Sequence, residues 1–176
     1  HTLIFDDPEC RPFYYKNGKS FKDYHKEGEI FWHKYVTYTE GMSDYWDYSF
    51  FNVSVIRYAD VLLLYAECLN DKGETTEAIN IINKVRARVN VPALPLTMSK
   101  AEVLKHLQDK ERPCELALEG SRWYDLVRWG IVEETLKAHN KPFVENYVDT
   151  KHQLFPIPHS EFLLNPDWEQ NPNYSK

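Results

Sequence analysis

The sequence has no run of about 18 apolar residues, the length that a membrane-spanning helix needs. It also has no excess of basic side chains, because 27 acidic residues outnumber 21 basic ones and give a net charge of -6. This balance argues against a nucleic-acid binder, which neutralises phosphates with a basic surface. No charged segment followed by an apolar one opens the chain, so the sequence suits a cytoplasmic protein, a mature secreted one or a piece of a longer protein.

Cysteine is scarce as well. Three cysteines are present, with neither a CxxC pair nor the Cys/His spacing of a zinc site: Cys10, Cys68 and Cys114. The odd number leaves at least one thiol free, and the disulfide state of the three stays open. Because Cys68 lies in an apolar run, we expect it to be a small buried side chain.

What the sequence does contain is enough apolar surface for a folded domain. Hydrophobic residues make up 43% of the 176 residues and charged residues 27%, a balance that a disordered chain does not have. Residues 1–51 hold 15 of the 26 aromatic residues (9 Phe, 5 Trp and 12 Tyr) and show no helical periodicity. We interpret 1–51 as an aromatic-rich, ligand-facing loop region with an extended piece at Ile30–Tyr38. Residues 52–176 form a helical region with an irregular, proline-rich tail, and we expect one compact unit.

The first helical block, Val55–Val89, has the periodicity of a helix pair. Four residues at i, i+3, i+4 and i+7 predict the buried face of the first helix: Leu62, Tyr65, Ala66 and Leu69. We expect Gly73 to end this helix in a left-handed conformation, and Thr75 or Thr76 to cap the second helix. Small residues at Ala66 and Ala78 are typical of an antiparallel, tetratricopeptide-like pair, which needs further helices to bury its faces.

The second helical block runs from Ser99 to about His139. Ser99 and Glu102 have the spacing of a capping box, and Pro113 is expected to break or kink the helix. Beyond Pro113 the spacing predicts a further helix with one face formed by four residues: Leu116, Gly120, Trp123 and Val127. Gly120 would then lie inside a helix, where it permits close contact with a neighbour.

Charged residues are dense in ERPCELALEGSRWYDLVRWG, which spans 111–130. Glu111, Glu115 and Glu119 recur every four residues, so neighbours in the row could lie about 5–6 Å apart, near the spacing of a retaining glycosidase pair. Such a pair needs one protonated carboxyl, whereas the nearby arginines favour ionisation. We therefore favour an ion-pair network that fixes helix geometry, with opposite charges three apart at Glu119/Arg122 and Asp125/Arg128.

Five blocks of sequence, in order, resemble the C-terminal half of the SusD/RagB family of outer-membrane nutrient-binding lipoproteins. They are RYADVLLLYAECLN, EAINIINKVRAR, ERPCELALEGSRWYDLVRWG, LFPIPHSEFLLNP and QNPNY, and they cover about Val55–Tyr174. The resemblance implies an all-α, mainly helical fold with tetratricopeptide-like pairs and long irregular loops. It also implies that the chain is a C-terminal fragment, since family members are longer and begin with a lipoprotein signal.

Two positions depart from the family pattern. Pro113 stands where arginines usually follow the glutamate, and Asn173 stands where glycine is common, although asparagine also tolerates positive φ. The matched blocks are framework motifs in the family, and they include eight charged or structural residues: Glu111, Glu115, Glu119, Gly120, Arg122, Trp123, Asp125 and Arg128.

The resemblance implies a non-enzymatic glycan-binding component of a nutrient-uptake system, lipid-anchored at the cell surface. Its partners would be a polysaccharide, an oligosaccharide or sometimes a peptide, and a TonB-dependent, SusC-like transporter barrel. An alternative role is a protein-interaction scaffold that docks on the barrel, with the ligand site elsewhere. Glycoside hydrolysis by the glutamate row is the more distant alternative.

Sugar recognition uses aromatic faces against pyranose C–H groups, with polar side chains nearby for the hydroxyls. The segment EIFWHKYVTYTEGMSDYWDYSFFN supplies both, and Trp46 is the first candidate. The full set of expected ligand residues is Trp46, Trp32, Tyr35, Tyr45, Tyr48, Asp44 and Asp47. No metal or cofactor is expected, because the acidic pairs at Asp6/Asp7 and Asp44/Asp47 lack the spacing of an EF-hand loop.

Overall fold

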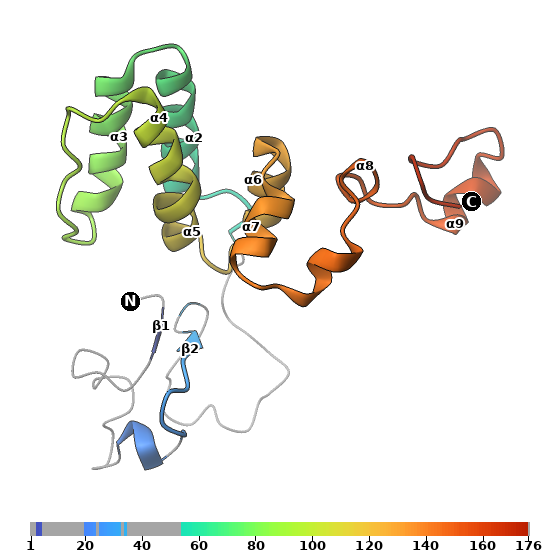
Figure 1. Cartoon of the computed structure of the whole chain (residues 1–176), viewed down its shortest axis with the longest axis horizontal. Coiled ribbons are helices and arrows are strands. Elements are labelled where there is room, and N and C mark those ends of the chain that lie inside the picture. The colour runs from blue at the N-terminus through green and yellow to red at the C-terminus, as the bar shows by residue number, and fades with distance from the viewer. Residues whose placement is uncertain (1–2, 5–19, 24, 33, 35–53, 176) are drawn as a thin grey trace. The chain divides into compact units, whose positions relative to one another are not determined.

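The computed structural model describes residues 3–4, 20–23, 25–32, 34 and 54–175 (Figure 1). These residues are mainly helical, which confirms the predicted fold class. The bounds of the elements are β1 Leu3–Ile4, η2 Phe21–Asp23, β2 Phe31–Trp32, α2 Tyr58–Asp71, α3 Thr75–Ala87, α4 Lys100–His106, η3 Leu107–Glu111, α5 Arg112–Glu115, α6 Arg122–Trp129, α7 Val132–Ala138, η4 Pro142–Asn146, α8 Asp149–His152 and α9 His159–Leu164. The short strands β1 and β2 pair antiparallel, and β2 lies within the expected extended piece.

Helices α2 and α3 form the predicted pair and lie side by side in Figure 1. Ala66 and Ala78 are both fully buried, as their small size predicts for the closest approach of two helices. Gly73 has φ +89°, and the amide of Glu74 donates to the Leu69 carbonyl at 2.9 Å, which confirms the left-handed end of α2. Glu74 precedes α3 without a side-chain cap, so the expected threonine cap is wrong.

A third helical segment covers the pair. It begins with the predicted capping box, in which the Ser99 amide donates to Glu102 at 2.7 Å. Val103 and Leu107 are fully buried and join the apolar cluster of α2 and α3. The extra helix thus supplies the burial that a single pair cannot provide for itself.

The chain passes Pro113 without leaving helical conformation. The turn before it, η3, is π-helical, and the Arg112 amide donates five residues back to the Leu107 carbonyl. A π turn widens the helix by one residue, which gives room for the proline ring and its missing donor. Pro113 therefore lies in the first turn of α5, where proline is tolerated.

Three expectations for single positions are wrong. Gly120 does not lie in a helix but in the turn between α5 and α6, with φ +78°. Tyr65 is 52% exposed, because the buried face of α2 runs through Leu63 instead. Cys68 is exposed on the same helix rather than buried.

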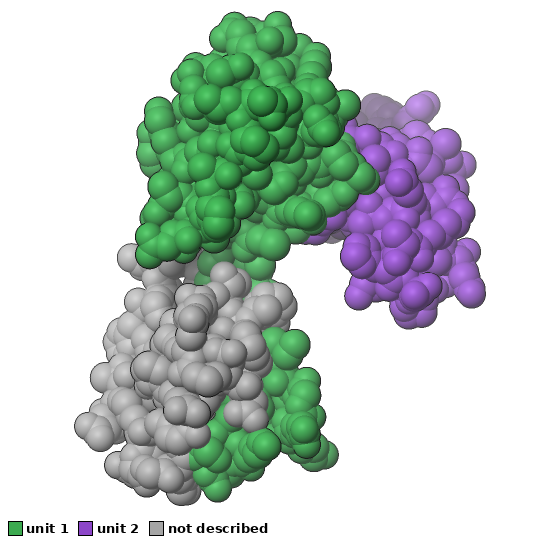
Figure 2. Space-filling view, turned by 60° about the vertical axis from the view of Figure 1, so that its left-hand side comes forward, with its two compact units in different colours: residues 1–119 green, residues 120–176 purple. Residues whose placement is uncertain are grey.

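The described chain forms two compact units, residues 1–119 and residues 120–176 (Figure 2). The division expected from composition falls elsewhere, between residues 51 and 52, and stays a prediction because most of 1–51 lies outside the described residues. The second unit packs Leu126, Val132 and Leu136 against one another, with Trp123 and Tyr147 at the edge of this cluster.

The tail of the second unit has short helices and side-chain contacts rather than a purely irregular course. The side-chain amide of Gln170 accepts a hydrogen bond from the Ile157 amide at 2.8 Å and donates one to the Ile157 carbonyl at 2.9 Å. The Tyr174 hydroxyl donates to the Leu154 carbonyl at 3.1 Å. Asn173 has φ +65°, which confirms the tolerance expected of asparagine at this position.

Candidate functional site

The aromatic residues expected to bind glycan lie largely outside the described residues. Trp32 is the exception, since its backbone in β2 pairs with Leu3. The other six candidates fall outside the described ranges: Tyr35, Asp44, Tyr45, Trp46, Asp47 and Tyr48. Their role as a ligand surface therefore stays a prediction.

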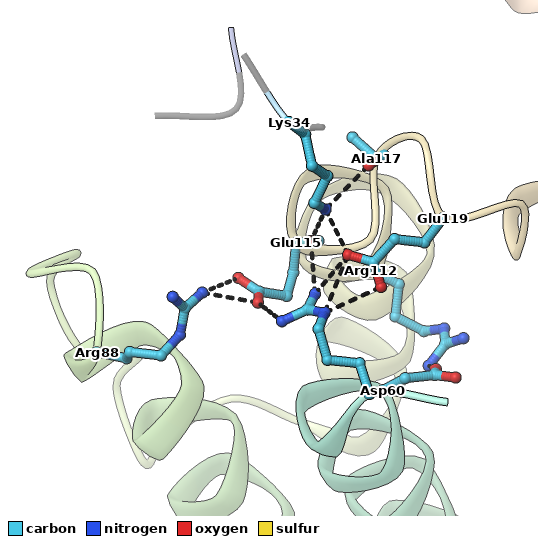
Figure 3. Close-up of polar contacts among 8 residues, drawn as sticks. Lys34, Asp60, Arg88, Arg112, Glu115, Ala117 and Glu119 are labelled. Carbon is cyan, nitrogen blue, oxygen red and sulfur yellow. Dashed lines mark hydrogen bonds and ion pairs between the residues drawn. The ribbon is translucent and has the colours of Figure 1, made fainter. Parts of the chain in front are cut away.

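The glutamate row forms a network of charged contacts in the first unit, and Figure 3 shows the part of it around Glu115 and Glu119. Each glutamate meets a cation from a distant part of the chain. Glu111 contacts Arg86 of α3, and Glu115 contacts Arg88, which directly follows α3. Glu119 contacts Lys34, which lies two residues beyond β2. The row thus connects the third helical segment to the helix pair and to the β2 end of the chain.

Arg57, the residue before α2, contacts two members of the row. Its Nε donates to both carboxylate oxygens of Glu119 at 3.0 Å. One terminal nitrogen lies 2.6 Å from Glu115 Oε1, and the other donates to the Glu115 carbonyl at 2.9 Å. The planar guanidinium therefore bridges two carboxylates, which a lysine could not do with the same geometry.

Glu111 lies in a more enclosed position. Its side chain is 9% exposed, and Oε2 lies 2.5 Å from an Arg86 nitrogen and 2.8 Å from His106 Nε2. A further ion pair joins the buried Arg112 to the half-buried Asp60 at 2.8 Å. These contacts fix η3 and α5 against α2 and α3.

The electrostatics of the row do not suit a general acid. Burial raises the pKa of Glu111, but hydrogen bonds from His106 and Arg86 outweigh it and lower the pKa below its usual value. Burial also raises the pKa of Glu119, but hydrogen bonds from Arg57 and Lys34 outweigh it and lower this pKa below its usual value. A retaining glycosidase needs one carboxyl with a raised pKa beside an ionised one, and both of these pKa values move the other way.

The remaining framework residues lie in the second unit. Asp125 is buried and contacts Arg128 at 2.9 Å, which is the predicted pair three residues apart. The Arg128 guanidinium also lies 4.4 Å from the centroid of the Trp129 ring. Trp123 meets the edge of Tyr147 at a centroid distance of 6.2 Å, and Arg122 begins α6.

Neither a metal cluster nor a membrane-spanning helix is found among the residues that the structure describes. No group of three or more His, Cys, Asp or Glu side chains is placed there to hold a metal ion. No helix in the same part of the chain has the length and apolarity to span a membrane.

The cations of the network were not predicted from the sequence; they are Lys34, Arg57, Arg86 and Arg88. Their contacts to the row span 25 to 85 residues of sequence. No local spacing rule reaches that far, since the charge pattern of a helix concerns neighbours three or four residues apart. Arg57 gave the only local sign, as a charged residue directly before a helix.

The family model and the most similar known sequences point to the same protein family. The model of a family described as "SusD family" matches residues 12–174. SusD-like protein P38 of Formosa agariphila is 37% identical over 130 residues, which is 70% of this chain and 25% of that protein. SusD-like protein P2 of the same organism is 31% identical over 131 residues, which is 70% of this chain and 26% of the relative.

Solved structures agree with the sequence matches. A SusD superfamily protein from Bacteroides vulgatus superposes with a TM-score of 0.65 and 37% identity, over 72% of this chain and 28% of that one. A SusD homolog from Bacteroides thetaiotaomicron gives a TM-score of 0.59 and 34% identity, over 80% of this chain and 30% of that one. The chain thus spans about a quarter of the length of the relatives it matches.

Proposed function

The chain belongs to the SusD family, and from this premise we propose that it is part of a cell-surface glycan-binding protein of a nutrient-uptake system. The observation that carries the proposal is the family match over residues 12–174, together with relatives more than 30% identical. The chain covers about a quarter of those relatives. The function proposed is therefore that of the protein to which this chain contributes.

The proposed mechanism is capture without catalysis. Aromatic faces in the segment around Trp46 would stack on pyranose rings, while Asp44 and Asp47 accept hydrogen bonds from hydroxyls. The lowered pKa values of Glu111 and Glu119 support a framework role for the glutamate row over an acid-base role. Captured glycan would pass to a TonB-dependent transporter barrel, with the protein held at the outer membrane by a lipid anchor.

Affinity electrophoresis tests the proposal. Native gels containing individual polysaccharides should retard the protein on at least one glycan, and Trp46→Ala should reduce the retardation. Trp168→Ala is the matched control, because Trp168 is a half-exposed tryptophan of the tail, 48% exposed and far from Trp46 in sequence. Equal loss in the two variants, or no retardation on any glycan in the panel, would contradict the proposal.

A second candidate function is a scaffold that docks on the transporter. It is favoured by the outer face of α2, where Tyr58, Val61 and Tyr65 are 75%, 45% and 52% exposed. Apolar side chains on one exposed helix face are typical of a protein interaction surface. Tyr65→Glu should then reduce co-purification with the barrel, whereas Lys84→Glu on the exposed side of α3 should not. Unchanged co-purification of Tyr65→Glu would exclude this face.

A further inference from the structure

Helix α8, Asp149–His152, is closed by one of its own side chains. The backbone amide of Val148, the residue before the helix, donates to Nδ1 of the His152 ring at 2.8 Å. In return the His152 amide donates to the Val148 carbonyl at 2.8 Å. The ring therefore satisfies one of the amides that a helix leaves without a helical partner at its N-terminal end.

The donor in this contact fixes the protonation state of the His152 ring. An amide nitrogen can only donate, so Nδ1 must carry a lone pair and the ring proton must lie on Nε2. Protonation of the ring turns Nδ1 into a second donor that faces the Val148 amide, and the contact is then lost. Histidine is the side chain that changes its charge between about pH 5 and 8, so mild acid is enough to break this hydrogen bond.

Two residues of the tail, Asn173 and Tyr174, contact this helix and the residues that follow it. The Tyr174 ring packs edge-on against the His152 ring at a centroid distance of 6.4 Å. Its hydroxyl donates to the Leu154 carbonyl at 3.1 Å, and Asn173 donates to the Thr150 hydroxyl at 3.2 Å. The position of these two tail residues thus depends on α8 and on the ring at its end.

Tyr147 packs on the same ring, and Asp149 lies one helical turn before it. The Tyr147 ring lies 5.7 Å from the His152 ring, measured between centroids. Burial and the acidic groups of Asp149 and Glu133 raise the pKa of Tyr147 to about 12. The Tyr147 hydroxyl and the Gln153 amide donate to the two Asp149 oxygens at 2.7 and 2.8 Å and lower the pKa of Asp149. Tyr147 is thus neutral and Asp149 ionised throughout the range in which histidine titrates.

A positive charge on the ring meets no equivalent new partner at this place. Both oxygens of Asp149 already accept hydrogen bonds, so pairing with Asp149 would compete with Tyr147 and Gln153. The ammonium of the neighbouring Lys151 lies 4.7 Å from the centroid of the Tyr174 ring, and like charges repel. Protonation therefore removes a contact of α8 without replacing it.

We propose that His152 is a pH-sensitive latch, which holds Asn173 and Tyr174 against α8 while its ring is neutral and releases them when the ring is protonated. Helix α8 has only four residues, so it depends strongly on the hydrogen bond at its start. Once that bond is lost, the two tail residues lose the surface on which they rest. The latch belongs to the second unit alone, and it does not depend on the proposed function.

NMR spectroscopy of the whole chain tests the latch directly. At about pH 7.5, nitrogen shifts of the His152 ring should show a proton on Nε2 and none on Nδ1. At about pH 5.5 the protection factor of the Val148 amide, which corrects for the pH dependence of intrinsic exchange, should fall at least about threefold. The heteronuclear NOE of the Asn173 and Tyr174 amides should drop with it, while amides of α7 stay protected. A proton on Nδ1 in the neutral ring, or unchanged values in acid, would overturn the proposal.

His152→Phe separates the hydrogen bond from the packing of the ring. Phenylalanine keeps an aromatic ring beside Tyr147 and Tyr174 but has no acceptor, so this variant should show the released values at both pH values. His139→Asn is the control, because His139 follows α7 at an exposed position, and it should keep the full pH response. If His152→Phe holds Tyr174 as firmly as the unaltered protein does at neutral pH, packing alone holds the tail and the latch is refuted. A pH response that persists in His152→Phe would belong to another group and would refute it equally.

Discussion

Glu111 offers the sharpest test of a single residue. Its carboxylate is 9% exposed and meets both Arg86 and His106, so Glu111→Gln would leave Arg86 enclosed without its full partner. We expect the free energy of unfolding to fall by about 2–4 kcal/mol, as measured by urea denaturation. Glu133→Gln is the matched control, because its pair with Lys137 is exposed and should contribute at most about 0.5 kcal/mol. Equal losses in the two variants would contradict the buried role of Glu111.

Acid should weaken the same network. The folded-state pKa of Glu111 and of Glu119 lies below the ordinary value of 4.5, because the neighbouring cations outweigh burial. The resulting stability is therefore fully present above about pH 4.5 and is lost as the pH falls through the folded-state pKa values. The urea midpoint should drop as the pH falls below about 4.5, and the drop should be shallower in the Glu111→Gln/Glu119→Gln double variant. Parallel curves for the two proteins would show that other groups carry the acid sensitivity.

Charge spacing within the row predicts pairing but cannot name the partners. Asp125 and Arg128 form the expected local pair at 2.9 Å, because both lie on one helix. For Glu119 the structure shows contacts with Lys34 and Arg57, which a local rule cannot reach, and the expected pair with Arg122 stays a prediction. A long side chain at a helix junction can reach several elements, and only the folded chain determines which one it meets.

At the scale of elements, the contact of α2 with α3 depends on small residues. Ala78 is fully buried against α2, so Ala78→Leu should force the helices apart and lower the free energy of unfolding by about 1–3 kcal/mol. Ala87→Leu makes the same change at an exposed position of the same helix and should have little effect. Circular dichroism in urea measures both variants. If Ala78→Leu left the free energy of unfolding unchanged, the interface between α2 and α3 would have space for a leucine side chain.

Local motifs predicted helix ends well where the chain itself supplies the partner. The Ser99 capping box and the left-handed Gly73 involve residues within five positions of one another, so their spacing was sufficient. The uninterrupted helix expected across Gly120 was wrong, because Leu118 and Gly120 both have positive φ and end the helix there. Lys34 donates to the carbonyls of Glu115 and Ala117 in this turn. Apolar residues continue at helical spacing across that turn, so periodicity alone does not predict the turn.

At the scale of the whole chain, fold class and family followed from five separated blocks in the correct order. Composition could not set the boundary between units, since the clusters at Leu63 and at Leu136 draw on similar apolar residues. The charged network is also a property of the whole chain. Each cation is evident in the sequence, but the convergence of Lys34 and Arg57 on Glu119 depends on contacts 62 to 85 residues apart.

The two units should differ in what a buried leucine contributes. Leu63 is fully buried in the cluster shared by α2, α3 and α4, whereas Leu136 is 6% exposed in a smaller cluster with Leu126 and Val132. Leu63→Ala leaves a cavity that the surrounding helices cannot fill. We therefore expect it to lower the free energy of unfolding by about 3–5 kcal/mol, against about 2–3 kcal/mol for Leu136→Ala. Leu164→Ala, at a position 78% exposed, is the control and should be nearly neutral.

Hydrogen exchange of the slowest amides in each unit measures these losses separately. In Leu63→Ala the slowest amides of α3 should lose more protection than those of α7 lose in Leu136→Ala, because more apolar contacts disappear at Leu63. The reverse order would mean that the smaller cluster is the more tightly packed of the two. Stability would then lie chiefly in the C-terminal unit, and the helix pair that carries Arg57 would be the part that opens first.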